Sequence, residues 1–257
     1  MSEPQTITSR DNALLVKLRK LALDGASYRR AGQVLIEGDH LCTALRARQW
    51  PALQAVVSET GWRTPALRDL AAWAPKLALV PDALFKGFST LESPAAIAFV
   101  IGLPEASAID PLAPTVVLDR LQDAGNVGSI LRSAAAFGFT QVLALKGTAA
   151  LWSPKVLRAG MGAHFALRLV EVLEPAALEA LRVPLVATSS HGGAELPLAE
   201  LPHPCAWVLG HEGQGVAAAL LARCALTVRI PQPGGEESLN VAAAAAVCLY
   251  ESARQAQ

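Results

Sequence analysis

The sequence predicts an α/β protein whose larger, C-terminal part contains a parallel β-sheet covered on both faces. From Thr115 onward, short apolar runs of strand length alternate with segments whose apolar residues recur at helical spacing. Several of the short runs, such as 141–145 (QVLAL) and 205–210 (CAWVLG), are apolar almost throughout. Strands of a parallel sheet have this character because helices cover them on both sides.

Length and composition exclude several other classes of protein. The chain has 257 residues, of which 52% are hydrophobic and 17% charged, with 22 Lys and Arg against 22 Asp and Glu. Such a chain buries a large core by itself, and it is neither disordered, collagen-like nor a small disulfide scaffold. The four cysteines form no CxxC pair and lie near no histidine at ligand spacing. We therefore expect reduced thiols and no metal site.

Targeting signals are not apparent in the sequence. No segment approaches the roughly 20 apolar residues that span a bilayer. The first twelve residues are polar and lack the apolar core of a signal peptide. We therefore expect a cytoplasmic protein that does not bind a membrane.

The first hundred residues predict a smaller α/β domain, and residues 102–114, rich in Pro and small residues, interrupt the pattern after it. We therefore divide the chain into a domain over 1–103, a linker over 104–114 and a domain over 115–257. The elements expected in the first domain are helices over 12–23 and through Leu41, Leu45 and Trp50, and strands at 33–37, 55–58, 77–80 and 96–100.

Apolar patterning also predicts the elements of the second domain. The expected strands are 115–121, 141–145, 167–171, 184–190, 205–210 and 226–230, and the expected helices run through 130–137, near 175–181, near 217–221 and from about 239 to 254.

Positive charge is concentrated at the N-terminal end of the chain. Residues 1–50 hold eight Lys and Arg against five Asp and Glu. Such an excess is typical either of a solvated helix face or of a modest phosphate-binding surface, and composition alone leaves both open.

Ligands of an open parallel sheet bind at the carboxyl ends of its strands, so the loops that follow the strands are the candidate sites. Four loops carry polar residues or clustered glycines: 119–134 with Asn126 and Arg132, 209–216 with Glu212, 230–245 with Ser238 and Asn240, and 187–193 with small hydroxyl residues.

Each of these loops, taken alone, is equally compatible with an ordinary turn, in which glycine serves the geometry and Ser238 caps a helix. The motifs of serine hydrolases, kinases, zinc peptidases, P-loop proteins and dinucleotide-binding proteins are absent from the sequence. The residues themselves therefore indicate an α/β enzyme or binding protein with a polar site near 126–132, 210–215 and 231–240.

Taken in order, three of the loops resemble a known family. NVGSILR (126–132), LGHEGQG (209–215) and IPQPGGEESLNVAAA (230–244) resemble the three signature motifs of the SpoU/TrmH family of RNA ribose 2′-O-methyltransferases, in the SPOUT superfamily. Residues 153–169 resemble the stretch that follows the first motif. Residues 29–45 and 88–100 are similar to family members with an N-terminal substrate-binding domain related to ribosomal protein L30e.

The resemblance implies a C-terminal parallel-sheet domain with a deep trefoil knot, a cleft for S-adenosylmethionine and a homodimer with the cleft near its interface. Three positions depart from the family pattern: His211 where Asn is frequent, Gln232 where Met is frequent and Ala242 where Ser is frequent. The residues that match the polar active-site set are Asn126, Arg132, Glu212, Ser238 and Asn240. Those that match cofactor-binding positions are Thr188, Leu209, Gly210, Gly215, Ile230 and Leu239.

The activity implied is methylation of a ribose 2′-hydroxyl in RNA. A sulfonium methyl group is already activated, so the enzyme has to align the 2′-oxygen and help remove its proton. A guanidinium with a pKa above about 12 is a poor base, so we expect Arg132, from either protomer, to stabilise the developing alkoxide. We expect Glu212 to fix either Arg132 or Asn126.

The L30e-like region favours ribosomal RNA over tRNA as substrate, because the tRNA ribose methylases of this family generally carry short helical extensions instead. Three alternatives stay open: a tRNA ribose 2′-O-methyltransferase, a non-catalytic RNA-binding or assembly factor of the same fold, and a nucleotide-binding enzyme unrelated to RNA.

Overall fold

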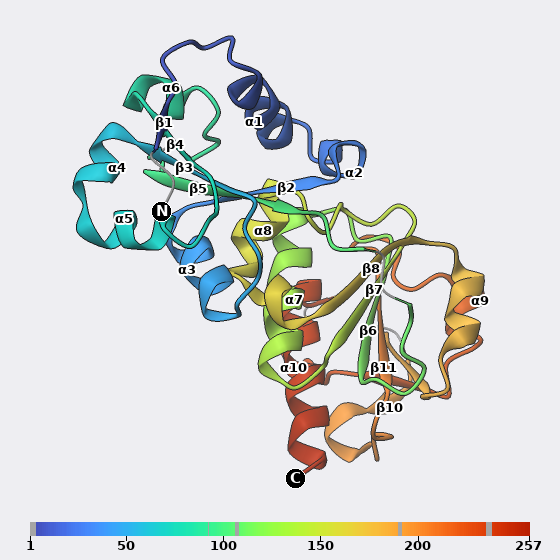
Figure 1. Ribbon diagram of the computed structural model, residues 1–257. Coiled ribbons are helices and arrows are strands. Elements are labelled where there is room, and N and C mark those ends of the chain that lie inside the picture. Colours follow the sequence, from blue (N-terminus) through green and yellow to red (C-terminus); the bar gives the residue numbers. More distant parts are fainter. Residues whose placement is uncertain (1–3, 92, 106–107, 190–191, 235–237) are drawn as a thin grey trace. The chain divides into compact units, whose positions relative to one another are not determined.

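The computed structural model describes residues 4–91, 93–105, 108–189, 192–234 and 238–257. The chain forms two compact units (Figure 1). The N-terminal unit consists of residues 1–105 and 152–165, and the C-terminal unit of residues 106–151 and 166–257. Each unit combines helices with a β-sheet of its own, which confirms the predicted α/β class.

The described residues of the N-terminal unit form a five-stranded mixed sheet in the order β1-β4-β3-β5-β2. Strand β4 pairs in parallel with β1 and β3, whereas β5 pairs antiparallel with β3 and β2. All four strands predicted for this region are confirmed. The elements are β1 (Gln5–Thr6), α1 (Ala13–Leu23), α2 (Ser27–Ala31), β2 (Gln33–Glu37), α3 (Asp39–Ala47), β3 (Gln54–Ser58), α4 (Glu59–Arg63), α5 (Pro65–Ala71), β4 (Leu77–Val80), α6 (Asp82–Lys86) and β5 (Ile97–Gly102).

Helix α1 follows the predicted pattern. The side chain of Asn12 accepts a hydrogen bond from the backbone N–H of Leu14 and so caps the first turn. Leu15, Leu18 and Leu21 are buried on one side of the helix. Helices α2, α4, α5 and α6 are five to seven residues long, which is too short for an apolar period to be recognised, so sequence patterning did not predict them.

The segment 152–165 lies between two strands of the C-terminal sheet in sequence but packs within the N-terminal unit. The indole N–H of Trp50 donates to the carbonyl of Phe165 at 3.1 Å, and the rings of Trp152 and Phe165 lie 5.9 and 5.4 Å from that of Trp50. A guanidinium N–H of Arg158 donates to the hydroxyl of Thr90 at 2.6 Å. The segment contains α8 (Pro154–Gly160), and η1 (Ala163–Ala166) ends just beyond it.

The C-terminal unit is built on a seven-stranded sheet in the order β10-β12-β9-β11-β6-β7-β8, in which the described strands all pair in parallel. The predicted parallel sheet is therefore confirmed. Its elements are β6 (Thr115–Asp119), α7 (Ala124–Ala136), β7 (Gln141–Leu145), β8 (Arg168–Leu173), η2 (Pro175–Ala180), β9 (Leu185–Thr188), β10 (Ala194–Glu195), η3 (Leu196–Leu198), β11 (Ala206–Gly210), α9 (Ala218–Leu221), β12 (Leu226–Arg229) and α10 (Val241–Gln255).

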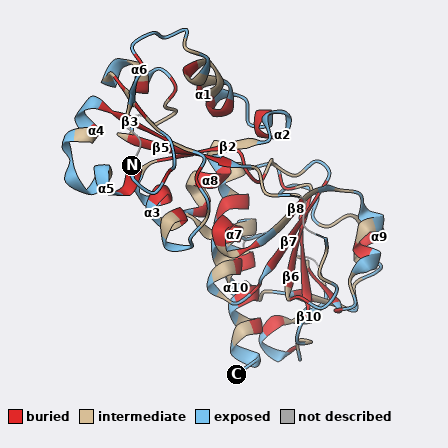
Figure 2. Ribbon diagram, in the orientation of Figure 1, coloured by how far each residue is buried: buried red, intermediate tan, exposed pale blue. Residues whose placement is uncertain are grey.

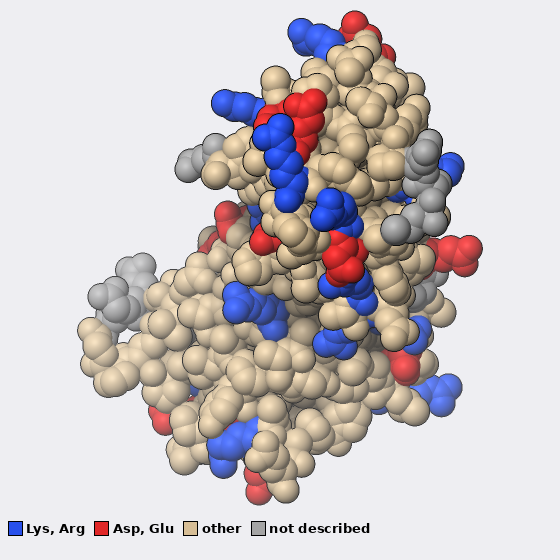
Figure 3. Space-filling model, turned by 60° about the vertical axis from the view of Figure 1, so that its left-hand side comes forward, with Lys and Arg blue, Asp and Glu red and all other residues tan. Residues whose placement is uncertain are grey.

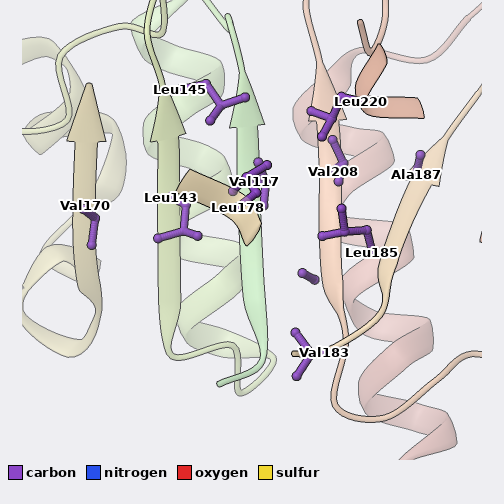
Figure 4. Packing of buried hydrophobic residues seen from close by; sticks show 11 residues of the cluster. Val117, Leu143, Leu145, Val170, Leu178, Val183, Leu185, Ala187, Val208 and Leu220 are labelled. Carbon is purple, nitrogen blue, oxygen red and sulfur yellow. The ribbon is translucent and has the colours of Figure 1, made fainter. Parts of the chain in front are cut away.

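Both faces of this sheet are covered, as its apolar strands require. Side chains such as Val117, Leu143 and Val208 form a cluster on one face, which includes Leu178 of η2 and Leu220 of α9 (Figure 4). Helices α7 and α10 pack side by side on the other face (Figure 1). The strands at the centre of both sheets are buried almost throughout (Figure 2).

Some element boundaries differ from the predicted ones for local reasons. The first strand of the C-terminal sheet ends at Asp119 rather than 121, because Arg120 has a left-handed backbone conformation. Helix α10 begins at Val241 rather than 239, because Asn240 caps it. The segment near 175–181 is a 3-10 helix, and β9 ends at Thr188; residues 190 and 191 of the predicted strand and loop lie outside the described residues.

Three of the cysteines, Cys42, Cys205 and Cys248, are buried, and Cys224 is half-buried. Burial raises the pKa of Cys205 to about 11 and that of Cys248 to about 12, so both thiols stay protonated at neutral pH. No helix in the described ranges is both long and apolar enough to span a bilayer.

The buried hydrogen bond between Trp207 of β11 and Ser252 of α10 gives a test of the packing on the helical face. The indole N–H donates to the Ser252 hydroxyl at 2.8 Å, and both residues are fully buried. Ser252→Ala leaves this N–H without an acceptor and is expected to lower the unfolding free energy by about 1–3 kcal/mol, measured by urea denaturation. Ser129→Ala on the exposed side of α7 serves as control, with a change below about 0.5 kcal/mol. Equal stability of both variants would contradict the assignment.

Candidate functional site

The three motif loops begin at one edge of the C-terminal sheet. Strand β11 pairs in register with β6, so that Gly210 lies opposite Asp119, and Val208 of the same strand lies opposite Ala187 of β9. Strand β12 pairs with the outer side of β9, where Val228 lies opposite Thr188. Because neighbouring parallel strands end at the same edge, the loops after β6, β9, β11 and β12 start side by side.

Hydrogen bonds join one side chain from each motif. The Oε1 atom of Glu212 accepts from the side-chain amide of Asn126 at 3.2 Å. The Oδ1 atom of Asn126 accepts in turn from the side-chain amide of Asn240 at 3.0 Å. Glu212, Asn126 and Asn240 are called the polar chain below. The structure thus brings together three of the five residues that match the family's active-site set.

Backbone contacts fix the direction of the polar chain. Asn240 caps α10, where its Oδ1 atom accepts from the N–H groups of Ala242 and Ala243, so that its amide NH2 group is turned to Asn126. Asp123 caps α7 by accepting from the N–H of Asn126 at 2.7 Å. Both asparagine amides therefore have defined orientations, since each oxygen and each NH2 group has its own partner.

Glu212 is held as an anion. Its carboxylate also accepts from the backbone N–H groups of Gln122 and Asp123, at 3.4 and 3.2 Å. Partial burial raises the pKa of Glu212, but hydrogen bonds from its own backbone, Asn126, Asp123 and Gln122 outweigh this effect and lower the pKa below its ordinary value. The polar chain therefore ends on a carboxylate that stays ionised at neutral pH.

Arg132 and Ser238 are not part of this network. Arg132 is exposed on α7 and forms no hydrogen bond or ion pair with any residue that the structure describes. It follows Asn126 by six residues, which places it roughly 240° around the helix axis. Glu212 therefore contacts Asn126 and not Arg132. Ser238 is exposed, makes no hydrogen bond within the described ranges, and is not the helix cap, because Asn240 has that role.

The residues expected to bind the cofactor surround the end of β11. A Cβ atom on Gly210 would lie 2.1 Å from the carbonyl carbon of Gly215 and the nitrogen of Val216, so only glycine lets the loop fold back here. Gly215 has a left-handed φ of 66° and borders open space. Leu209 is fully buried, so only its backbone is available to a ligand.

Of the other expected cofactor residues, Thr188 ends β9 and Ile230 directly follows β12, whereas Leu239 directly precedes the cap of α10. Thr188 and Ile230 are half-buried, and Leu239 is 42% exposed. In the third loop, the buried Oε1 atom of Gln232 has no hydrogen-bond partner in the described part of the chain. This acceptor is therefore available to a donor group of a bound ligand. Glycine turns, strand-end backbone and this acceptor fit a small polar ligand such as S-adenosylmethionine.

Sequence reasoning missed two aspartates of the site. Asp119 ends β6, is buried, and accepts from the backbone N–H of Ala217 at 2.8 Å. Asp123 both caps α7 and donates its N–H to Glu212. The signals were present, because an acidic residue that ends an apolar strand or precedes a helical run by one residue is typical of such contacts. The described residues contain no group of three or more His, Cys, Asp and Glu side chains that could hold a metal ion.

The lowered pKa of Glu212 leads to a pH-dependent prediction. Glu212→Gln should reduce stability at pH 7, because the new NH2 group cannot accept from the backbone N–H groups. The carboxylate contributes stability above the unfolded pKa of about 4.3, and this contribution is lost as pH falls through the lowered folded pKa. The stability difference from wild type should therefore shrink between pH 7 and pH 3 in urea denaturation. Glu179→Gln, at an exposed position, is the control; a difference for Glu212→Gln that does not change with pH would refute the interpretation.

Comparison with known proteins shows the family of the chain. The SpoU rRNA Methylase family model matches residues 113–250. The Bacillus subtilis protein named 23S rRNA (guanosine(2553)-2′-O)-methyltransferase RlmP is 34% identical over 222 residues, which cover 84% of this chain and 86% of the relative. A Streptomyces viridochromogenes protein named 23S rRNA (uridine(2479)-2′-O)-methyltransferase is 30% identical over 97% of this chain and 92% of the relative.

Solved structures agree with these matches. The SpoU methyltransferase AviRb from Streptomyces viridochromogenes, in complex with the cofactor AdoMet, has a TM-score of 0.87 at 27% identity and covers 95% of this chain and 98% of its own. A structure named RNA 2′-O ribose methyltransferase has a TM-score of 0.80 at 34% identity and covers 98% of this chain and 99% of its own. Because the family model spans more than half of the chain, including every strand of the C-terminal sheet, the chain belongs to the SpoU rRNA methylase family.

Proposed function

We propose that this chain transfers the methyl group of S-adenosylmethionine to a ribose 2′-hydroxyl of ribosomal RNA, in the cytoplasm. The observation that carries this proposal is the polar chain, which joins the three family motifs beside the glycine turn at the end of β11. The named activities of the Bacillus and Streptomyces relatives, both on 23S rRNA, favour ribosomal RNA over tRNA.

The cofactor lies at the ends of β9, β11 and β12 in this proposal. Gly210, Gly215, Ile230 and Leu239 hold it together with Thr188 and the backbone of Leu209. When bound, S-adenosylmethionine supplies a sulfonium methyl group that is ready for in-line displacement. Gln232 offers its buried oxygen as an acceptor for an N–H or O–H group of the cofactor.

The side chains of the site position the ribose and stabilise its charge. The polar chain holds two amide groups in fixed orientations beside the cofactor, and Ser238 adds a hydroxyl at the exposed rim. Arg132 stabilises the negative charge that develops on the 2′-oxygen, and the proton leaves to a neighbouring group or water. A guanidinium suits this role, because it stays protonated at every physiological pH.

The position of Arg132 favours a homodimer in which it serves the partner's site. Arg132 makes no hydrogen bond to the polar chain of its own protomer and lies roughly 240° around the α7 axis from Asn126. The neighbouring helix α10 exposes Val247 and Tyr250, at 42% and 55%. The ring of Tyr250 lies 5.8 Å from that of Phe137, at the C-terminal end of α7, so α7 and α10 together offer an apolar surface for the partner in this proposal. We also assign the trefoil knot to the C-terminal unit, on the basis of the family resemblance.

We propose that residues 1–103, which make up most of the N-terminal unit, form an L30e-like domain that binds the RNA, followed by a linker over 104–114 and the methyltransferase domain over 115–257. Helices α1 and α2 carry Lys17, Arg19, Lys20, Arg29 and Arg30. On the face shown in Figure 3, Lys and Arg are interspersed with Asp and Glu and form no large field of one sign. The excess of positive charge in residues 1–50 is small, with eight Lys and Arg against five Asp and Glu, so we expect few phosphates to be neutralised and a shallow salt dependence of RNA binding.

Methyl transfer to RNA tests the proposal directly. Labelled S-adenosylmethionine is incubated with the wild-type chain and transcripts of ribosomal RNA or tRNA, and 2′-O-methyl products are mapped by nuclease digestion. Label is expected on ribosomal RNA, and Arg132→Ala should reduce the rate about 100-fold or more while cofactor binding stays unchanged. Label on tRNA alone would contradict the assigned substrate. A chain that binds the cofactor but labels neither transcript nor ribosomal particles would contradict catalysis.

Mixing of subunits tests whether Arg132 acts on the partner's site. Arg132→Ala and Asn126→Ala homodimers are each expected to be inactive. In a mixed dimer, one site then has an intact polar chain and the intact Arg132 of the other protomer, so a 1:1 mixture should recover about a quarter of wild-type activity. If Arg132 serves its own protomer, every site in the mixture lacks one group, and activity should stay at the level of the single variants.

A further inference from the structure

Arg120 has an unusual backbone conformation. It directly follows β6 and lies in the left-handed region, with φ of 61°. Glycine and asparagine adopt this conformation at little cost, whereas a long side chain normally avoids it. Contacts of the Arg120 side chain and backbone therefore have to compensate for the strain.

The guanidinium of Arg120 joins the end of β6 to the loop 211–217. Its Nε and Nη2 atoms donate to the two carboxylate oxygens of Asp119, at 2.9 and 3.2 Å. Its Nη1 atom donates to Oε1 of Gln214 at 3.1 Å. The buried carboxylate of Asp119 also accepts from the N–H of Ala217. The pair of Asp119 and Arg120 thus fastens the loop at two points, Gln214 and Ala217.

The backbone of Arg120 is held from the opposite side. The hydroxyl of Thr148 accepts from the N–H of Arg120 at 3.1 Å and donates to the carbonyl of Leu118 at 3.0 Å. Gly147, with φ of 94°, packs so closely that a Cβ atom there would lie 3.3 Å from Cγ of Arg120. Both ends of the arginine are therefore fixed before any ligand arrives.

The loop that Arg120 fastens has two glycines, Gly213 and Gly215, so without fastening it would sample many conformations. It carries Glu212 and adjoins Gly210. We propose that Arg120 is a positioning residue that holds the loop 211–217 in the conformation that receives S-adenosylmethionine. Ordering the loop in advance reduces the entropy lost on binding and so raises affinity. This inference rests on the proposed function, because it takes S-adenosylmethionine as the ligand.

Calorimetric titration of the full chain with S-adenosylmethionine tests the inference. Arg120→Gly removes the guanidinium and leaves the buried carboxylate of Asp119 without its cation, so the Kd is expected to rise about tenfold and the Tm to fall. Gln214→Ala leaves the pair of Asp119 and Arg120 intact and should also raise the Kd. The double variant should bind no more weakly than Arg120→Gly alone, because both changes remove the same contact.

Steady-state kinetics separate positioning from a general structural role. In Arg120→Gly the KM for S-adenosylmethionine should rise, whereas kcat at saturating cofactor and the KM for RNA stay near wild type. Arg120→Lys keeps a long cation and should restore part of the affinity. Arg223→Gln is the matched control, because the Arg223 guanidinium donates to the carbonyl of Pro175, away from the loop, and its loss should leave cofactor affinity unchanged.

Two results would overturn the inference while the proposed function stands. One is wild-type cofactor affinity in both Arg120→Gly and Gln214→Ala. The other is weaker binding in Arg120→Gly with no change of affinity in Gln214→Ala, because Arg120 would then be structural only. If the wild-type chain bound no S-adenosylmethionine, the proposed function would fail, and the inference with it.

Discussion

The carboxylate of Glu212 is the group on which the geometry of the site depends. It sits at the N-terminal end of α7, where backbone N–H groups lack partners within the helix and favour an anion. Because a carboxylate only accepts hydrogen bonds, the NH2 group of Asn126 is turned toward Glu212. The oxygen of Asn126 is then free to accept from Asn240. Donors therefore point one way along the polar chain, from the third motif through the first to the second. A neutral group in place of the carboxylate would remove the reason for that direction.

The parallel sheet supplies the second constraint. Segments that are about 20 to 115 residues apart in sequence meet because β6, β11, β9 and β12 are neighbours and end at one edge. The meeting also needs a close approach of backbones, since any side chain on Gly210 would collide with Gly215 and Val216. Strand order thus positions the motif residues that donate or accept hydrogen bonds. The glycines between these residues allow the loops to approach one another closely.

The sequence predicts those features of the fold that burial and local hydrogen bonding determine. Apolar runs such as 141–145 and 205–210 predict strands, because strands covered on both faces have to be apolar. Strand order, the packing of 152–165 in the N-terminal unit and the conformation of Arg120 depend on contacts distant in sequence, so no local pattern predicts them. In the site, the loops were predictable, but the choice of Asn126 over Arg132 as partner of Glu212 depends on which side of α7 faces the loop.

The departure at His211 shows what the second loop requires of its sequence. The Nδ1 atom of His211 accepts from the N–H of Gly213 at 3.0 Å, two residues along the chain. Asparagine, which is frequent at this position in the family, accepts from the N–H two residues on in the same way. The loop therefore needs an acceptor at this position rather than one particular residue, as it needs glycine at Gly210 and an anion at Glu212. A site that requires only hydrogen-bond donors, acceptors and close backbone approaches at a few positions tolerates many substitutions at other positions. This agrees with the solved structures that share the fold at 27 to 34% identity.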